Sequence, residues 1–153
     1  MDVISKKSAW DTARMGLFLS EAVIPVRIAV NDGDFPMICS IWFYYDAERE
    51  QLVCASHQRS KLARLLQQNP RCGFEIAPNE PPYCGVRGKA TVEMDPAQAA
   101  KSLQILIQKY LGQSNSGLGQ WLLSRVDEEY EIRLTPTWVT AWDYGQRMEA
   151  TID

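Results

Sequence analysis

The segment LVCASHQRSKLARLL, residues 52–66, joins two different hydrophobic patterns within one short stretch. Its first part, residues 52–56, is an apolar run that ends in small and hydroxylated side chains, which is typical of a strand. Ser60 is a helix-capping residue type, and leucines at helical spacing follow it until Asn69-Pro70. The segment therefore predicts a strand, a short basic loop and a helix that begins at Ser60-Lys61.

This junction has the chemistry of a phosphate site. A helix N-terminus offers free backbone N–H groups, Ser56 and Ser60 offer hydroxyls, and Lys61 offers a compact positive charge. The same residues are equally typical of a plain capped helix in which Arg59 and Lys61 are solvated. These residues alone leave both interpretations open.

Strand patterns dominate the sequence on both sides of this segment. Helices are predicted at residues 8–21 with Ser8 as the cap, at residues 95–112 with Asp95 as the cap, and near residues 121–126 after a loop at residues 113–119. Residues 35–45 are nearly all apolar or aromatic, so we expect a strand that is buried on both faces. We expect the last strand to be broken at Pro136. The strands are predicted at residues 23–31, 35–45, 52–56, 71–77, 84–94 and 130–143.

The order of these elements favours antiparallel pairing, because short turns join most of the predicted strands. Closure into a barrel would remove exposed sheet edges. We therefore expect one α+β domain over residues 1–153, with an N-terminal helix, a barrel over about residues 22–143 and a short C-terminal tail.

Composition excludes several classes of protein. A formal net charge of −3 argues against a nucleic-acid binder, and no apolar run approaches the roughly 20 residues that cross a bilayer. No secretory signal is visible, so we expect a soluble cytoplasmic protein. The four cysteines are widely spaced, which favours buried reduced thiols over a disulfide framework or a metal site. They are Cys39, Cys54, Cys72 and Cys84.

An ordered series of short motifs extends over roughly residues 22–143. It resembles the pyridoxamine 5′-phosphate oxidase-like family of FMN-binding split barrels. The resemblance implies a six-stranded split β-barrel with peripheral helices, and a homodimer with two flavin sites at the subunit interface. The series consists of the turn Asn31-Asp32-Gly33, Phe35-Pro36 at the start of the apolar strand that contains Trp42, Ser60-Lys61, Asn69-Pro70, residues 83–88 and the stretch PTWVTAWD at residues 136–143.

The resemblance also implies site residues. Lys61 and Ser60 match the pair that contacts the cofactor phosphate. A strand backbone that runs along the flavin ring and the end of a neighbouring strand contribute the rest, namely Ser40, Ile41, Trp42, Ala55 and Ser56. The chain departs from the oxidase at Cys39, where the oxidase has an arginine, and it lacks the basic C-terminal segment that holds the oxidase substrate. We therefore expect a compact family member and not the oxidase itself.

Other aromatic and titratable residues have two interpretations each. Trp121 and Trp138, together with Trp142, are candidates to line the cofactor pocket from the partner subunit, or else to pack in the core and the dimer interface. His57 is a candidate donor to flavin or ligand to haem, or a solvated loop residue. No spacing singles out an acid/base pair, so no catalytic residue is assigned. Four glutamates are interpreted as surface carboxylates, namely Glu75, Glu93, Glu128 and Glu129.

Three functional hypotheses follow. The first is an FMN-dependent oxidoreductase that acts on a small aromatic or heterocyclic substrate, with a deazaflavin as a variant cofactor. The second is a flavin or haem carrier or sensor without turnover. The third is an empty barrel that serves as a dimeric interaction module.

Overall fold

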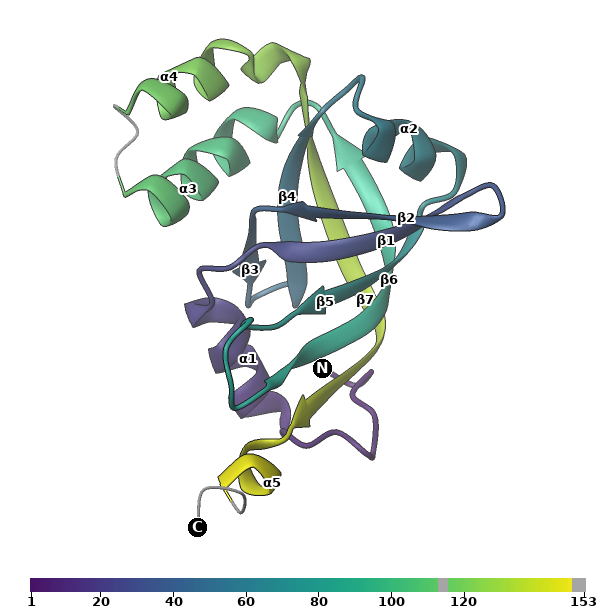
Figure 1. Ribbon diagram of the computed structural model, residues 1–153. Helices are drawn as coiled ribbons and strands as arrows, with labels where there is room; N and C mark the ends of the chain where they lie inside the picture. The colour runs from purple at the N-terminus through teal and green to yellow at the C-terminus, as the bar shows by residue number, and fades with distance from the viewer. Residues whose placement is uncertain (113–115, 150–153) are drawn as a thin grey trace.

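The computed structural model describes residues 1–112 and 116–149. Its main feature is one antiparallel sheet of seven strands in the order β2-β1-β5-β6-β7-β4-β3 (Figure 1). The prediction of an α+β fold with mainly antiparallel strands is confirmed. The strands are β1 (Val26–Asp32), β2 (Phe35–Ile41), β3 (Phe43–Asp46), β4 (Gln51–His57), β5 (Arg71–Ile76), β6 (Cys84–Asp95) and β7 (Glu129–Asp143).

The two edge strands of the sheet, β2 and β3, are separated in the chain by Trp42 alone. β2 ends where Ile41 pairs with Val26 of β1, and β3 begins where Phe43 pairs with Cys54 of β4. Because one residue spans only a few ångströms, the opposite edges lie close together and the sheet has to curl. No ladder joins β2 to β3 in the described part of the chain, so the sheet is open. The prediction was a six-stranded split β-barrel; the sheet has seven strands and is not closed, which corrects the strand number and the expected closure.

The prediction that residues 35–45 form one strand buried on both faces is wrong. Phe35 is 80% exposed and Ile38 is 67% exposed, while Cys39 and Ile41 pack against the core. Each of the two strands into which this run divides lies at an edge of the sheet, and β2 has only one face on the core. An apolar run therefore does not imply burial on both faces when no second layer covers the strand.

The helices are α1 (Thr12–Glu21), α2 (Lys61–Gln68), α3 (Ala99–Leu111), α4 (Gly117–Ser124), a short 3₁₀ helix (Val126–Glu128) and α5 (Gly145–Glu149). Figure 1 shows α3 and α4 together over the end of the sheet near β4, with α2 beside the β1–β2 hairpin. The predicted loop at residues 113–119 lies partly outside the described residues.

Helix caps were predicted with mixed success. Ser60 caps α2 as predicted, and Gly112 ends α3 in the left-handed conformation. Asp11 caps α1 in place of Ser8. Asp95 still belongs to β6, and its carboxylate accepts a hydrogen bond from the backbone N of Ala97, so α3 begins later than predicted.

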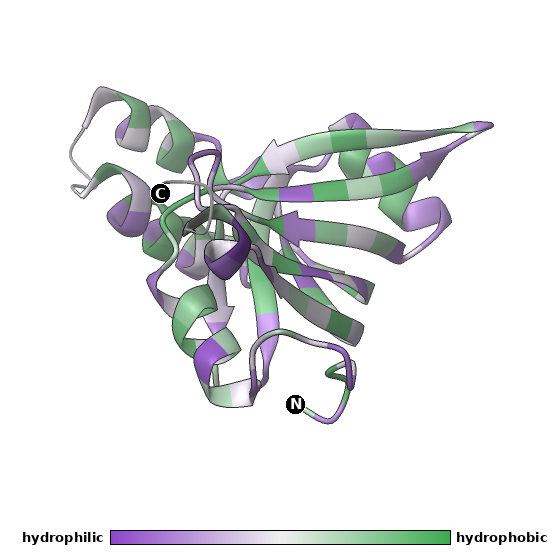
Figure 2. Cartoon of the chain, turned by 60° about the horizontal axis from the view of Figure 1, so that its bottom comes forward, coloured by the Kyte–Doolittle hydropathy of each residue, from purple (hydrophilic) through white to green (hydrophobic). Residues whose placement is uncertain are grey.

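The core lies inside the curl of the sheet. Its central side chains are at most 1% exposed, and each such burial contributes roughly 1.5–3 kcal/mol relative to exposure. Hydrophobic and hydrophilic bands alternate along the strands in Figure 2, as expected for strands with one face on the core. All four cysteines are free. Among the described residues, no helix combines the length and apolar character needed to cross a membrane. The central side chains include Ile28, Phe43, Leu52, Ile132 and Leu134.

β7 lies between β6 and β4 and runs through Pro136 without a break, which corrects the sequence prediction. The ladder with β6 shifts register at this point. Lys89 lies opposite Trp138 and Ala90 lies opposite Pro136, so Thr137 has no partner in the ladder. The irregularity accommodates the missing N–H of proline, which is the usual role of a bulge.

Candidate functional site

A pocket of about 310 Å³ lies where β2, β4 and β7 meet the helices α3 and α4. We call it the α3–α4 pocket. Four of the residues predicted to contact a cofactor ring line it, although they come from two strands and the link at residue 42. Leucines of α3 and α4 supply most of the remaining surface, so the walls are largely apolar. The lining residues are Ser40, Ile41, Trp42, Ala55, Leu103, Leu106, Leu118, Leu122 and Glu129.

Trp42 is held in place by contacts with the end of α3. Its ring stacks on Tyr110 with centroids 5.0 Å apart and an interplanar angle of 6°. The Tyr110 hydroxyl donates a hydrogen bond to the carbonyl of Ile24 (2.8 Å), and the backbone N of Phe43 donates to that hydroxyl (3.2 Å). Lys109 Nζ donates to the carbonyl of Phe43 at 3.0 Å. The aromatic wall of the pocket is therefore fixed before any ligand binds.

Within the part of the chain that the structure describes, Glu129 is the only charged residue that lines the α3–α4 pocket. It is 8% exposed, and burial is the main cause that raises the pKa of its carboxyl. Within residues 1–112 and 116–149, its carboxylate makes no hydrogen bond and no ion pair. The interpretation of Glu129 as a surface carboxylate is wrong, because α3 and α4 cover this end of β7.

The hydroxyls at the start of α2 bind each other. Ser56 Oγ and Ser60 Oγ lie 2.9 Å apart, and Ser60 Oγ also accepts a hydrogen bond from the backbone N of Ala63 at 3.0 Å. The sequence predicted both residues for a phosphate site. The structure brings them into contact at the end of β4, one residue beyond Ala55 of the α3–α4 pocket.

Lys61 lies in a different hollow. Its Nζ is 2.5 Å from Oδ2 of Asp32, the last residue of β1, and its side chain is 55% exposed. The hollow has a volume of about 290 Å³ and is lined by Asp32, Lys61, Arg64, Leu65 and Gln68. It shares no lining residue with the α3–α4 pocket, so the predicted site residues fall into two groups.

His57 has both ring nitrogens engaged. Nε2 is 2.8 Å from Glu128 Oε2, and Nδ1 accepts a hydrogen bond from the backbone N of Arg59 at 3.0 Å. The hydrogen bond from His57 is the main cause that lowers the pKa of Glu128. This loop is therefore tied to the 3₁₀ helix before β7.

The tryptophans predicted to come from a partner subunit lie away from the α3–α4 pocket of their own chain. Trp121 on α4 is 52% exposed, with the guanidinium of Arg125 at 4.6 Å from its ring centroid. Trp138 on β7 is 39% exposed on the outer face of the sheet, with Lys89 Nζ at 6.0 Å. Their contribution to a partner's site stays a prediction.

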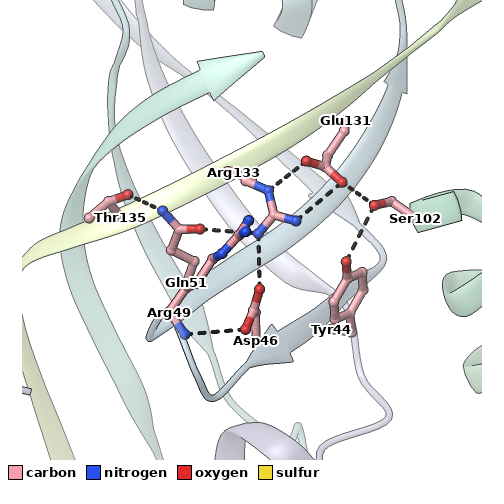
Figure 3. Close-up of polar contacts among 8 residues, drawn as sticks. All are labelled: Tyr44, Asp46, Arg49, Gln51, Ser102, Glu131, Arg133 and Thr135. Carbon is pink, nitrogen blue, oxygen red and sulfur yellow. Dashed lines mark hydrogen bonds and ion pairs between the residues drawn. The ribbon is translucent and has the colours of Figure 1, made fainter. Parts of the chain in front are cut away.

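A buried polar cluster that sequence reasoning missed lies on the same face of β7 as Glu129 (Figure 3). Glu131 is 2% exposed; it accepts hydrogen bonds from the Ser102 hydroxyl and from Arg133 Nε. Arg133 Nη1 also donates to Asp46 Oδ2 at 3.1 Å and to Gln51 Oε1 at 3.1 Å. Every charge in this cluster has a partner on another strand or helix, so the cluster joins α3 to the sheet.

No protein-family model and no curated protein matches the sequence. Solved structures do match. The conserved hypothetical protein Rv2991 from Mycobacterium tuberculosis superposes with a TM-score of 0.77 at 14% identity, over 94% of this chain and 91% of that chain. An F420 reductase has a TM-score of 0.67 at 19% identity, over 80% and 93%. A Listeria innocua protein provisionally named pyridoxamine 5′-phosphate oxidase has a TM-score of 0.64 at 14% identity, over 84% and 95%.

At these identities the likeness concerns the fold. The chain has the fold of pyridoxamine 5′-phosphate oxidase-like split barrels, as the motif series predicted. The comparisons carry no information about which of the predicted residues contact a ligand.

Proposed function

We propose that the protein binds a flavin-type cofactor with its ring in the α3–α4 pocket, and FMN is the first candidate. One observation carries the proposal: the fold brings Ser40, Ile41, Trp42 and Ala55 around a single apolar pocket beside a rigid aromatic wall. About 310 Å³ is at the lower end of the range for ligand pockets, which suits one flat ring system.

The edge position of β2 adds to this fit. β2 pairs only with β1, so its other side presents backbone N–H and C=O groups that no strand uses. A flavin ring has an edge of alternating hydrogen-bond donors and acceptors, which such a strand is able to match. When bound, the flavin would supply hydride or electron transfer, and the residues of the pocket would orient the ring and exclude water.

We assign the phosphate to the start of α2. Helix-terminal amides, the Ser60 hydroxyl and Lys61 are suitable donors, and Arg64 lies in the same hollow as Lys61. Phosphate binding would replace Asp32 as the anion beside Lys61. A deazaflavin is the second candidate, and the fold shared with an F420 reductase favours it. Haem is disfavoured at His57, because ligation would break a hydrogen bond at either nitrogen.

The reaction class we infer is a flavin-dependent oxidoreduction of a small molecule. A flavin-binding protein without turnover is the alternative, and a reductant with candidate acceptors added to the loaded protein separates the two. Free cysteines fit a reducing compartment such as the cytoplasm.

The test of the cofactor is the visible absorption spectrum of the purified protein before and after addition of FMN. We expect a two-band flavin spectrum and saturable binding. A protein that carries no chromophore and does not bind added FMN would contradict the proposal.

Lys61→Ala tests the phosphate assignment. We expect FMN affinity to fall by about 1.5–3 kcal/mol, the contribution of a hydrogen bond to a charged group. Arg59→Ala is the matched control, since it removes an exposed cation two residues away, and we expect a smaller effect. Unchanged affinity in Lys61→Ala would place the phosphate elsewhere.

A second copy of the chain is the partner we propose for the outer face of the sheet. One cross-strand row passes over five strands: Ile38 is opposite Ala29, Ala29 is opposite Gly73, Gly73 is opposite Lys89, and Lys89 is opposite Trp138. These residues line a hollow of about 420 Å³. The small centre between Ile38 and Trp138 leaves room for a side chain from another molecule.

Charge on the neighbouring row makes this face suitable for self-association. In that row Glu75 lies between Arg27 and Arg87, which are its neighbours on the two adjacent strands. The charges along the row are therefore positive, negative and positive. Two copies related by a two-fold axis can place the Glu75 of each beside an arginine of the other. A partner subunit docked here would bring its own Trp138 to the interface, which is one of the interpretations that the sequence left open for this residue.

Analytical ultracentrifugation tests the dimer. We expect a dimer for the wild type and a monomer for Ile38→Asp, because the added charge would be buried without a partner. Leu17→Asp on α1 is the control, since Leu17 is 57% exposed and lies on another element. A monomeric wild type would contradict the proposal.

A further inference from the structure

Glu129 is a largely buried acidic residue that lines the α3–α4 pocket. A buried carboxylate without a hydrogen-bond partner is costly, and most buried polar groups in proteins are paired. Glu129 is 8% exposed and its carboxylate has no partner among the described residues, but no fully buried oxygen there lacks a partner, so the carboxylate still opens onto the α3–α4 pocket. A hydrogen-bond donor on a bound ligand would lower the free energy of such a carboxylate.

The two basic residues that act electrostatically on Glu129, His57 and Arg125, make their side-chain contacts with other groups. His57 lies opposite Glu129 in the ladder between β4 and β7, but its Nε2 binds Glu128. Arg125 lies between α4 and the 3₁₀ helix, with Nε 3.8 Å from Glu128 Oε2 and its guanidinium over the ring of Trp121. His57 and Arg125 therefore both contact Glu128, and they act on Glu129 through their electrostatic field without a hydrogen bond or ion pair to its carboxylate.

The surroundings of Glu129 in the α3–α4 pocket define what a ligand has to bring. Among the described residues, Ser40 supplies the one other polar side chain of the lining, and the rest of the described lining is apolar or aromatic. A ligand that fills this pocket is therefore flat and largely apolar, and it has one edge able to donate a hydrogen bond to a carboxylate.

We propose that Glu129 is the specificity-determining residue of the α3–α4 pocket, where it binds an N–H group of a flat aromatic ligand, favours cationic ligands and excludes anionic ones. The proposal deepens the proposed function, because it rests on the same pocket and names the chemistry of its ligand. The N–H group has two possible sources: the ring of the cofactor itself, or a separate nitrogen-containing aromatic substrate.

Three probes of similar shape and different charge test the proposal. They are benzamidine, which is a cation, benzamide, which is neutral, and benzoate, which is an anion. Titration calorimetry on the full chain at pH 7 measures their affinities. We expect benzamidine to bind most tightly, benzamide less tightly and benzoate least tightly, with benzamidine about 10- to 100-fold tighter than benzamide. Equal affinities for the three probes, or no binding of benzamidine, would overturn the proposal.

Glu129→Gln keeps the size of the side chain and removes its charge. We expect this variant to lose most of the preference for benzamidine while it binds benzamide within about twofold of the wild type. Glu93→Gln is the control, because Glu93 is an exposed carboxylate of the same sheet, and it is expected to behave as the wild type. Benzamidine binding that is unchanged in Glu129→Gln would contradict the assignment. Urea unfolding of each variant verifies that it is folded, and Glu129→Leu serves as a second variant.

FMN titrations separate the two sources of the N–H group. If the cofactor ring supplies it, Glu129→Gln weakens FMN binding and benzamidine competes with FMN. If a separate ligand supplies it, FMN binds both proteins equally and benzamidine does not compete with FMN, which would place the flavin ring outside the α3–α4 pocket. A wild type that binds benzamidine in the expected order but does not bind FMN would overturn the flavin proposal and leave the role of Glu129 intact.

Discussion

Glu129 and Glu131 lie two residues apart on the same face of β7, and both are buried, at 8% and 2% exposure. Glu131 is surrounded by its own donors, Ser102 from α3 and Arg133 from β7 (Figure 3). Glu129 has the apolar α3–α4 pocket in front of it and no donor among the described residues. The contrast shows how one strand face divides into a structural part, where buried charge is compensated within the chain, and a part that is suited to a ligand.

Arg133→Met breaks the comparison most directly, because it removes the positive charge beside Glu131 and leaves this buried carboxylate with the Ser102 hydroxyl as its donor. We expect a loss of about 3–5 kcal/mol in the free energy of unfolding, the usual result of removing one partner of a buried ion pair. Urea denaturation measures it. Arg49→Met is the control, since the Arg49 side chain is exposed, and it is expected to stay within about 0.5 kcal/mol of the wild type. A loss below about 1 kcal/mol in Arg133→Met would mean that the cluster is not structural.

Ser102→Ala removes one donor from Glu131 and keeps Arg133 in place. The Ser102 side chain is 1% exposed, so water does not readily replace the lost hydroxyl. The expected cost is about 1–3 kcal/mol, the penalty of a buried acceptor with one unmade hydrogen bond. Ser20→Ala on the exposed surface of α1 is the matched control. An effect as small as that of the control would show that Arg133 alone satisfies Glu131.

Tyr44→Phe removes the outermost hydroxyl of the cluster. The Tyr44 hydroxyl is 3.3 Å from Ser102 Oγ, and the ring itself is retained. We expect a loss of about 0.5–1.5 kcal/mol, typical of one neutral hydrogen bond. Tyr83→Phe, at a more exposed tyrosine, is the control. A loss larger than that of Ser102→Ala would contradict the inference that the Tyr44 hydroxyl contributes less to the cluster than Ser102 does.

Glu129→Gln is expected to cause no loss of stability in the free protein, because its carboxylate has no partner to lose. The pKa of Glu129 is raised by burial above its usual 4.5, so the folded state holds the proton more tightly than the unfolded state does. Wild-type stability therefore declines as the pH rises from 4.5 through the raised pKa, and the decline is absent in Glu129→Gln. Urea unfolding across this range measures the difference between the two proteins. A variant that is less stable than the wild type at pH 7 would reveal a partner for Glu129.

Much of the fold could be predicted from local patterns. Strands, turns and the α2 cap follow from alternation and from residue types at the turns. The division of residues 35–45 into two edge strands could not be predicted, because no turn residue marks it. Trp42 leaves the sheet and stacks on Tyr110, which is distant in the sequence, so the division depends on tertiary packing.

The lining of the α3–α4 pocket could be predicted only in part. The resemblance pointed to Ser40, Ile41, Trp42 and Ala55, and these residues do line one pocket. Glu129 was missed because adjacent glutamates before a strand resemble a solvated surface. The alternation of polar and apolar residues from 129 to 134 predicts a strand with a polar face, but nothing in it shows that two helices cover that face.

The central place of β7 has a consequence for folding during synthesis. β4 and β6 each use β7 as a neighbour, although β7 is the last strand of the sheet to leave the ribosome. Until then, the β3–β4 hairpin and the sheet formed by β1, β2, β5 and β6 each expose a free edge. We therefore expect the nascent chain to be prone to aggregation until residue 143 has emerged, and chaperone dependence to concentrate in that interval.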